Sequence, residues 1–245
     1  MRWHTADLHF NHPNIARYCN RPALKSWMLT ATGQWASPDA AYECAEKMNA
    51  ALIRATNARV GPTDTVVHYG DFSCRGGEHG VRGLHTPPAE IIKQLNGRWV
   101  LITGNHDKNN GVHTVCDFVV MKLSTYTVGG QHKPLFDYEA YAAYQLLTPE
   151  AKAANPWFVP EHVAARETLH AKYCLAQCHF IICGHVHNSW QTKKIAGIWH
   201  VNVGVDANNG HPLNDVEVLG LYHKALQSEK APEKQSERQV QPIAE

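Results

Sequence analysis

The chain has 245 residues, of which 44% are hydrophobic and 18% are charged, and its formal net charge is +1. This length can bury a sizeable core in one large domain, and the composition is ordinary for a soluble globular protein. The near-zero charge excludes a global electrostatic field that would attract nucleic acid or a membrane surface.

Membrane insertion and secretion are not expected from the sequence. No run approaches the roughly 18 consecutive apolar residues of a membrane helix. The opening MRWHTADLHF lacks the charged leader and apolar segment of a signal peptide. The seven cysteines form an odd count without a regular framework, which favours reduced thiols and a cytoplasmic location. No obligate protein partner is indicated.

Short apolar runs that predict buried strands alternate with helical patterns along the chain. The expected strands are Trp3–Ala6, Thr65–Tyr69, Trp99–Thr103, Phe180–Cys183 and Ile198–Val205. The expected helices, with apolar residues at spacings of three and four, are Pro38–Asn57, Pro88–Leu95 and His162–Cys178. This alternation predicts an α/β fold with a substantial sheet.

One domain is expected over residues 1–226. Within it, residues 124–160 have a turn signal at Gly129–Gly130 and a helix-like stretch at Tyr138–Leu147. We interpret this segment as an insertion or cap over one edge. Residues 227–245 are polar and nearly free of large apolar side chains, which predicts a disordered tail.

Four of the expected strands are followed by side chains that can bind a metal. The motifs, in chain order, are Asp7-Leu8-His9, Gly70-Asp71, Gly104-Asn105-His106-Asp107 and Gly184-His185-Val186-His187. Each alone is weak, since a Gly-Asp pair, for example, is ordinary turn chemistry. Open α/β sheets place their sites at the carboxyl ends of strands, so the ordered set indicates one shared site.

The residue types indicate the chemistry of that site. Carboxylate, imidazole and amide groups suit divalent ions such as Mn, Fe, Zn, Ni or Mg. A carboxylate can bridge two ions, and ion pairs about 3.5–4 Å apart activate a water for in-line displacement at phosphorus. The sequence therefore predicts a two-metal site that acts on a phosphate ester.

The ordered motifs resemble the calcineurin-like metallophosphoesterases over most of residues 1–220. Small bacterial and phage-encoded members are similar to this chain at Asp7-Leu8-His9-Phe10, Asn14-Ile15, Cys19-Asn20-Arg21-Pro22, Asn96-Gly97 and Asn202-Val203-Gly204-Val205-Asp206. The resemblance implies a four-layer sandwich of two central mixed β-sheets flanked by helices.

The resemblance also implies roles for individual residues. Asp7, His9 and His187 would hold the first metal ion, and Asp71 would bridge both ions. Asn105 and His185 would serve the second ion. His106 would act as the acid, and Asp107 would orient His106 and favour its protonated form.

A further histidine for the second ion has no clear match. His132 has the expected proline two residues later, but no clear apolar strand precedes it. His162 and His170 are the alternatives, and we favour His132. His12 and Arg17 follow the first motif closely enough to bind substrate, although a solvated helix start explains them equally well.

We therefore hypothesise a phosphodiesterase with two divalent ions, manganese first among them, that uses a metal-bridging hydroxide. Its substrate would be a small phosphate ester, with nucleotides as one class. A nuclease acting on longer strands is the enzymatic alternative. A binding scaffold that kept this fold and lost catalysis is the alternative from another class.

Overall fold

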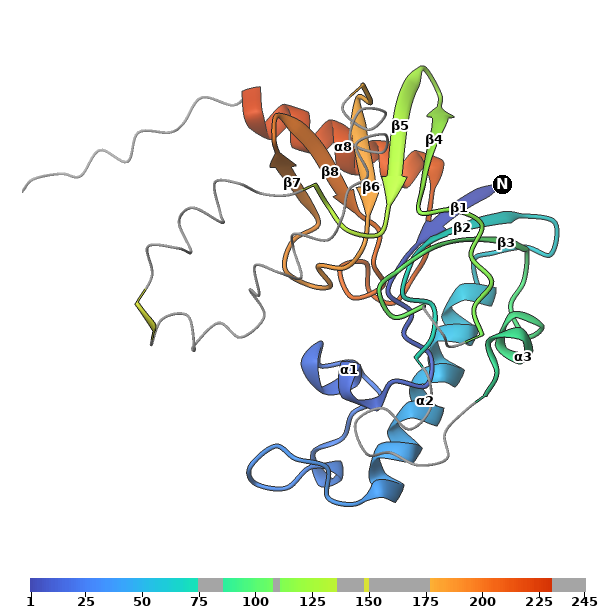
Figure 1. Ribbon diagram of the computed structural model, residues 1–245, viewed down its shortest axis with the longest axis vertical. Helices are drawn as coiled ribbons and strands as arrows, with labels where there is room; N and C mark the ends of the chain where they lie inside the picture. Colours follow the sequence, from blue (N-terminus) through green and yellow to red (C-terminus); the bar gives the residue numbers. More distant parts are fainter. Residues whose placement is uncertain (75–85, 108–110, 136–147, 150–176, 231–245) are drawn as a thin grey trace, which may run out of the picture.

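The computed structural model describes residues 1–74, 86–107, 111–135, 148–149 and 177–230, which form two β-sheets and their flanking helices (Figure 1). The first sheet has the order β3-β2-β1-β9. Its strands are β1 (Arg2–Thr5), β2 (Thr65–Tyr69), β3 (Arg98–Ile102) and β9 (Leu213–Asn214). The first three run parallel, and β9 is antiparallel to β1.

The second sheet has the order β4-β5-β6-β8-β7. Its strands are β4 (Phe118–Leu123), β5 (Tyr126–Gln131), β6 (Phe180–Cys183), β7 (Thr192–Ile195) and β8 (Ile198–Asn202). The central strands β5, β6 and β8 are parallel, and the edge strands are antiparallel. The predicted α/β fold with two mixed sheets and flanking helices is therefore confirmed.

Helix α2 (Pro38–Asn57) covers the outer face of the first sheet together with α3 (Pro88–Ile92) (Figure 1). The start of α2 is fixed because Ser37 Oγ accepts the Ala40 N–H at 3.1 Å. Alanine, cysteine, methionine and leucine line its buried face. The smaller helices α1 (Pro13–Tyr18) and η1 (Ser26–Met28) lie between β1 and α2 in the sequence, and α1 packs on α2.

The main core lies between the two sheets. Val67 and Ile102 of the first sheet pack against Val128 and Ile182 of the second in one buried cluster. Helix α8 (Asp215–Lys230) joins the same cluster, where the Tyr222 ring stacks on Phe180 at 4.3 Å. This packing holds the two sheets in a fixed relation.

The two sheets meet at the carboxyl ends of their central strands. A parallel bridge joins Ala6, just after β1, to Gly204, just after β8. The Asp7 N–H donates to the Gly70 carbonyl at 3.1 Å, which ties the turn after β1 to the turn after β2. The turns that carry the predicted ligands are therefore brought to one place.

Several sequence expectations need correction. The segment 124–160 does not begin as an insertion, because Tyr126–Gln131 is β5, paired with both β4 and β6. The disordered tail is predicted to begin at residue 227, which is too early, because α8 continues to Lys230. Lys194 donates a hydrogen bond to Glu229 within this last turn at 2.5 Å. The helix predicted as Tyr138–Leu147 lies outside the described residues, as do all but the last two residues of the helix predicted as His162–Cys178.

Three expected strands shift or shorten. The strand predicted as Ile198–Val205 ends at Asn202, because the chain then turns over Asp7. Strands β1 and β3 each begin and end one residue earlier than expected. None of the helices within the described residues has the length and apolar character needed to cross a bilayer.

Candidate metal centre

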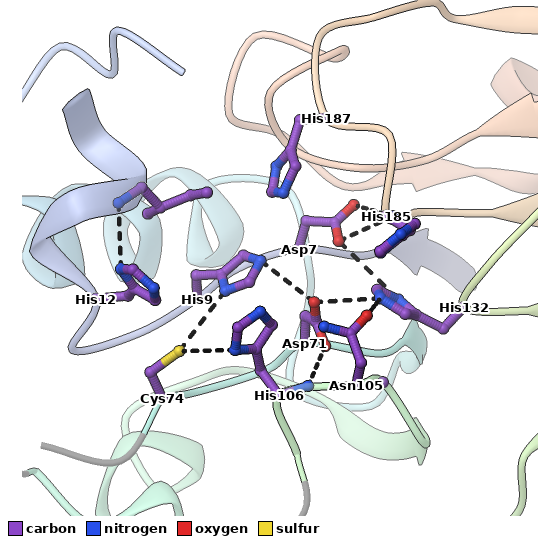
Figure 2. A network of polar contacts seen from close by, with 12 residues as sticks. Asp7, His9, His12, Asp71, Cys74, Asn105, His106, His132, His185 and His187 are labelled. Atoms are coloured by element: carbon purple, nitrogen blue, oxygen red, sulfur yellow. Dashed lines mark hydrogen bonds and ion pairs between the residues drawn. The ribbon is translucent and has the colours of Figure 1, made fainter. Parts of the chain in front are cut away.

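The side chains predicted from four separate turns lie together at the carboxyl ends of the strands. Figure 2 shows them turned toward one another from both sheets. The group consists of Asp7, His9, Asp71, Asn105, His106, His132, His185 and His187. The predicted convergence of these turns on one place therefore agrees with the structure.

One half of the group is made by Asp7, His9 and His187. One ligand atom from each lies within 4.8 Å of the others. Asp7 and His9 follow β1, and His187 follows β6, so the half-site joins the two sheets. The Asp7 carboxylate also accepts the backbone N–H of His185, with oxygen distances of 3.0 and 2.9 Å.

The other half is made by Asp71, His132 and His185, again with ligand atoms within 4.8 Å of one another. His132 Nε2 lies 3.1 Å from an Asp71 oxygen and 3.1 Å from Asn105 Oδ1. His132 Nδ1 lies 2.7 Å from the Tyr69 carbonyl. Because a carbonyl only accepts, Nδ1 carries hydrogen and Nε2 remains as the ligating atom.

Asp71 connects the two halves. Its Oδ2 is 3.5 Å from His9 Nε2 and 3.1 Å from His132 Nε2. Its Oδ1 accepts the His106 backbone N–H at 2.8 Å, which fixes the carboxylate orientation. A carboxylate in this position can face two cations at once.

The floor of the centre is buried and its rim is accessible. Asp7, His9, Asp71 and His132 are at most 4% exposed, whereas Asn105 is exposed. His9 Nε2 is buried without a hydrogen-bond partner among the described residues. Buried carboxylates beside an unpartnered imidazole nitrogen fit a pair of divalent cations that a substrate could reach from the rim.

The electrostatics of the metal-free centre support this fit. Burial raises the pKa of Asp7, so this carboxyl needs a nearby positive charge to ionise. Burial also opposes ionisation of Asp71, but the neighbouring His132 holds the Asp71 pKa well below its usual value. Burial lowers the pKa of His132, but the neighbouring Asp71 carboxylate outweighs burial and raises this pKa to about 9. In effect, a protonated imidazole supplies the positive charge that the carboxylates require.

The backbone at the ligands is strained. Five predicted ligands have left-handed φ values, which non-glycine residues adopt at a cost of about 1–3 kcal/mol each. These residues are Asp7 (58°), His9 (49°), Asp71 (59°), His185 (69°) and His187 (46°). Such conformations persist only where surrounding contacts impose them, and they concentrate at functional sites.

The glycines in the motifs allow the turns to approach one another. A Cβ on Gly184 would lie 2.6 Å from an Asp7 oxygen. A Cβ on Gly104 would lie 2.1 Å from the Asp71 nitrogen. The glycines predicted beneath a ligand are thus required by close contact with the two carboxylate residues.

The side chains of His106 and Asp107 make different contacts. His106 lies in the centre, with its Nδ1 3.7 Å from Cys74 Sγ and its ring 5.1 Å from that of His9. The Asp107 carboxylate instead accepts the backbone N–H groups of Asp71, Phe72 and Gly104 at 2.8–2.9 Å. The orienting role expected for Asp107 is therefore corrected, because its oxygens hold the two ligand turns together.

The two candidate substrate-binding residues, His12 and Arg17, have different surroundings. The His12 ring lies 6.0 Å from that of His106, and its Nδ1 caps α1 by accepting the Ile15 N–H at 3.2 Å. Arg17 contacts Asn14 and lies over the Trp35 ring, and neither of these residues is a predicted metal ligand. His162 and His170 lie outside the described residues.

Three residues at the centre were given no role from the sequence. Cys74 Sγ lies 3.8 Å from His9 Nδ1 and 3.7 Å from His106 Nδ1. Asp206 Oδ2 is 2.8 Å from His187 Nδ1, and Arg21 bonds Asp206. Asp206 has a sequence signal that could have identified it, since it follows an apolar run and a glycine, as three of the four ligand motifs do. Burial lowers the pKa of His187, but the hydrogen bond with Asp206 outweighs this effect, so the pKa is raised to about 11.

Comparisons with known proteins agree with the fold and the motifs. The model of the calcineurin-like phosphoesterase family matches residues 2–189. An uncharacterised protein of Methanocaldococcus jannaschii, MJ1445, is 33% identical over 165 residues, which cover 61% of this chain and 77% of that protein.

Two solved structures are among those similar to this chain, and the first of them has a similar fold. A protein of unknown function from Aquifex aeolicus, AQ665, has a TM-score of 0.54 and 22% identity, over 90% of this chain and 98% of that one. A conserved uncharacterised protein of Streptococcus pneumoniae, described as a predicted phosphoesterase, is 13% identical with a TM-score of 0.34, over 83% and 71% of the two chains. The family match over more than half of the sequence shows that this chain belongs to the calcineurin-like phosphoesterases.

Proposed function

We propose that this protein is a metal-dependent phosphodiesterase with two divalent cations, manganese being the first candidate. The observation that carries the proposal is the pair of three-residue ligand groups, Asp7–His9–His187 and Asp71–His132–His185, that meet at Asp71. When bound, two such cations would activate a water and stabilise the charge on the phosphoryl oxygens.

The side chains around the cations have separate tasks in this proposal. Asp71 would face both ions, since its Oδ2 lies between His9 and His132. Asn105 Oδ1, at the accessible rim, would complete the second half-site beside His132. The buried floor would keep bulk water away from the reacting atoms, so that their electrostatic interactions are strong.

His106 would supply the proton to the leaving oxygen. Its Nδ1 faces Cys74, and its backbone N–H is held by Asp71, so the imidazole is fixed relative to the ligands. A fixed imidazole at the partly exposed rim suits a general acid for substrates whose leaving groups are poor. His12 is a candidate for contact with the same substrate, because its ring lies 6.0 Å from that of His106.

A catalytically inactive scaffold is the alternative from another class, because the sequence alone shows no clear histidine for the second half-site. His132 follows β5 directly and points its Nε2 at Asp71 and Asn105, which favours the enzyme. The formal net charge of +1 provides no general attraction to long nucleic-acid strands, which disfavours a nuclease, and a small phosphate ester is therefore the proposed substrate.

The deciding experiment is hydrolysis of bis-p-nitrophenyl phosphate with added Mn²⁺, compared with the same protein in chelator. The proposal expects activity that chelator abolishes and Mn²⁺ restores. His106→Ala should retain metal and lose most turnover on alkyl phosphodiesters, while activated aryl esters react closer to the wild-type rate. An absence of hydrolysis with every divalent metal, together with no metal uptake, would favour the scaffold.

A further inference from the structure

A buried ion pair lies directly behind the first half-site. Arg21 and Asp206 have side chains only 6% and 5% exposed, and they are 185 positions apart in the chain. Arg21 Nε and Nη2 each bond one Asp206 oxygen at 2.8 Å, which is the planar two-point geometry of the strongest arginine–carboxylate pairs.

Both members of the pair reach the residues that would bind metal. Asp206 Oδ2 lies 2.8 Å from Nδ1 of His187. Arg21 Nη2 donates to the Asp7 carbonyl at 2.7 Å, and Nη1 donates to the Leu8 carbonyl at 2.8 Å. The guanidinium therefore connects the turn after β1 with Asp206, which follows β8. Asp206 extends this connection to His187 in the turn after β6.

We propose that Arg21 and Asp206 are positioning residues that set the geometry of Asp7 and His187 for the first cation. The inference rests on the proposed function and adds two residues to it. Asp206 accepts the hydrogen on His187 Nδ1, so the ring is oriented with Nε2 toward Asp7 and His9. Arg21 balances the buried charge of Asp206 and holds the carbonyls of the strained turn in which Asp7 has a φ of 58°.

A different assignment for Asp206 is less consistent with the contacts. Asp206, Cys19 and His187 have potential ligand atoms within 4.8 Å of one another, so they could form a separate metal site. However, both Asp206 oxygens already bond the Arg21 guanidinium, and that positive charge repels a second cation. The orientation of His187 Nδ1 toward Asp206 fits a supporting carboxylate.

The test is Mn²⁺ uptake by chelator-treated full-length protein, measured by equilibrium dialysis and elemental analysis. The variants are Asp206→Ala, Asp206→Asn and Arg21→Lys, with His187→Ala as the reference for loss of the first ion. The matched control is Glu217→Gln, which removes an arginine–glutamate pair with Arg59 that contacts no described ligand. Thermal unfolding in chelator confirms that each variant is folded.

We expect Asp206→Ala to bind one of its two ions about 10–100-fold more weakly, as outer-shell partners of ligating histidines do. The electron paramagnetic resonance spectrum should change from a coupled manganese pair to an isolated ion, as in His187→Ala. Asp206→Asn keeps an acceptor for His187 Nδ1 and should lose less. The Glu217→Gln control should bind both ions normally.

Two ions bound to Asp206→Ala with wild-type affinity would overturn the positioning role while leaving the phosphodiesterase proposal intact. Equal weakening of both ions would also overturn it, because the predicted ligands that the pair contacts within the described residues, Asp7 and His187, belong to the first half-site. If Asp206→Ala does not fold, the same comparison is decided by Asp206→Asn. A wild-type protein that takes up no Mn²⁺ and hydrolyses no diester would instead refute the proposed function and this inference together.

Discussion

Replacing Asp107 should destabilise the protein by breaking the link between two ligand turns. Its carboxylate is 4% exposed and accepts three backbone N–H groups, those of Asp71, Phe72 and Gly104. A buried donor left without an acceptor costs about 1–3 kcal/mol. Asp107→Asn keeps one acceptor oxygen, so we expect its unfolding free energy to fall by about 1–3 kcal/mol. Asp107→Ala leaves all three N–H donors without an acceptor, and the loss of unfolding free energy should be about three times larger.

The assay is urea unfolding in chelator, so that bound metal does not contribute to stability. Glu43→Gln is the control, because it removes an exposed pair with Lys47 on α2 and should cost about 0.5 kcal/mol or less. Turnover of Asp107→Asn should also fall, since Asp71 would no longer be held in place. Lost turnover with an unchanged unfolding midpoint would refute this reasoning and favour the role of orienting His106 that the sequence suggested.

Three further predictions concern other parts of the centre and the core. Gly104→Ala should abolish Mn²⁺ uptake or folding, because its Cβ would lie 2.1 Å from the Asp71 nitrogen; normal uptake measured by dialysis would contradict this. Cys74→Ala removes the sulfur beside the Nδ1 atoms of two histidines and should lower diester turnover by about 10-fold, whereas the buried Cys44→Ala on α2 should not change turnover in the same assay. The third prediction concerns Asp215. Burial raises the pKa of this carboxyl, but hydrogen bonds from histidine and arginine side chains outweigh burial and lower the pKa to about 2. A depressed carboxyl pKa stabilises the fold above the unfolded value near 4, and this contribution is lost as pH falls from about 4 to about 2. The stability difference between wild type and Asp215→Asn, followed by acid-dependent urea unfolding, should therefore be constant above about pH 5 and shrink below pH 4; a difference independent of pH would argue against the depressed pKa.

The sequence alone determined the elements whose pattern is local. Strands β2 and β6 and helix α2 have the predicted bounds, because apolar runs of four or five residues and a proline after a serine cap are short-range signals. The ligand turns could also be located, since a strand of this kind ends abruptly in glycine and metal-binding side chains. Their convergence followed from the general rule that parallel strands present their carboxyl ends on one side.

Strand β5 was not predicted, because its sequence is not typical of a strand. Tyr126–Gln131 contains two glycines, and these read as a turn. The structure shows a reason for one of them, since a Cβ on Gly130 would lie 2.3 Å from the Tyr69 ring. His132 is fixed by that strand, so its place beside Asp71 could not be derived from its local sequence.

The supporting contacts of the centre were decided only by the tertiary structure. Arg21 meets Asp206 across 185 positions, and Asp107 bonds backbone groups of a turn 35 and 36 positions away. Such partners leave no periodic trace, because a hydrogen bond between distant turns depends on how the two sheets pack. The sequence determined which side chains can bind metal, whereas the packing of β1, β2 and β6 decided which neighbours hold them in place.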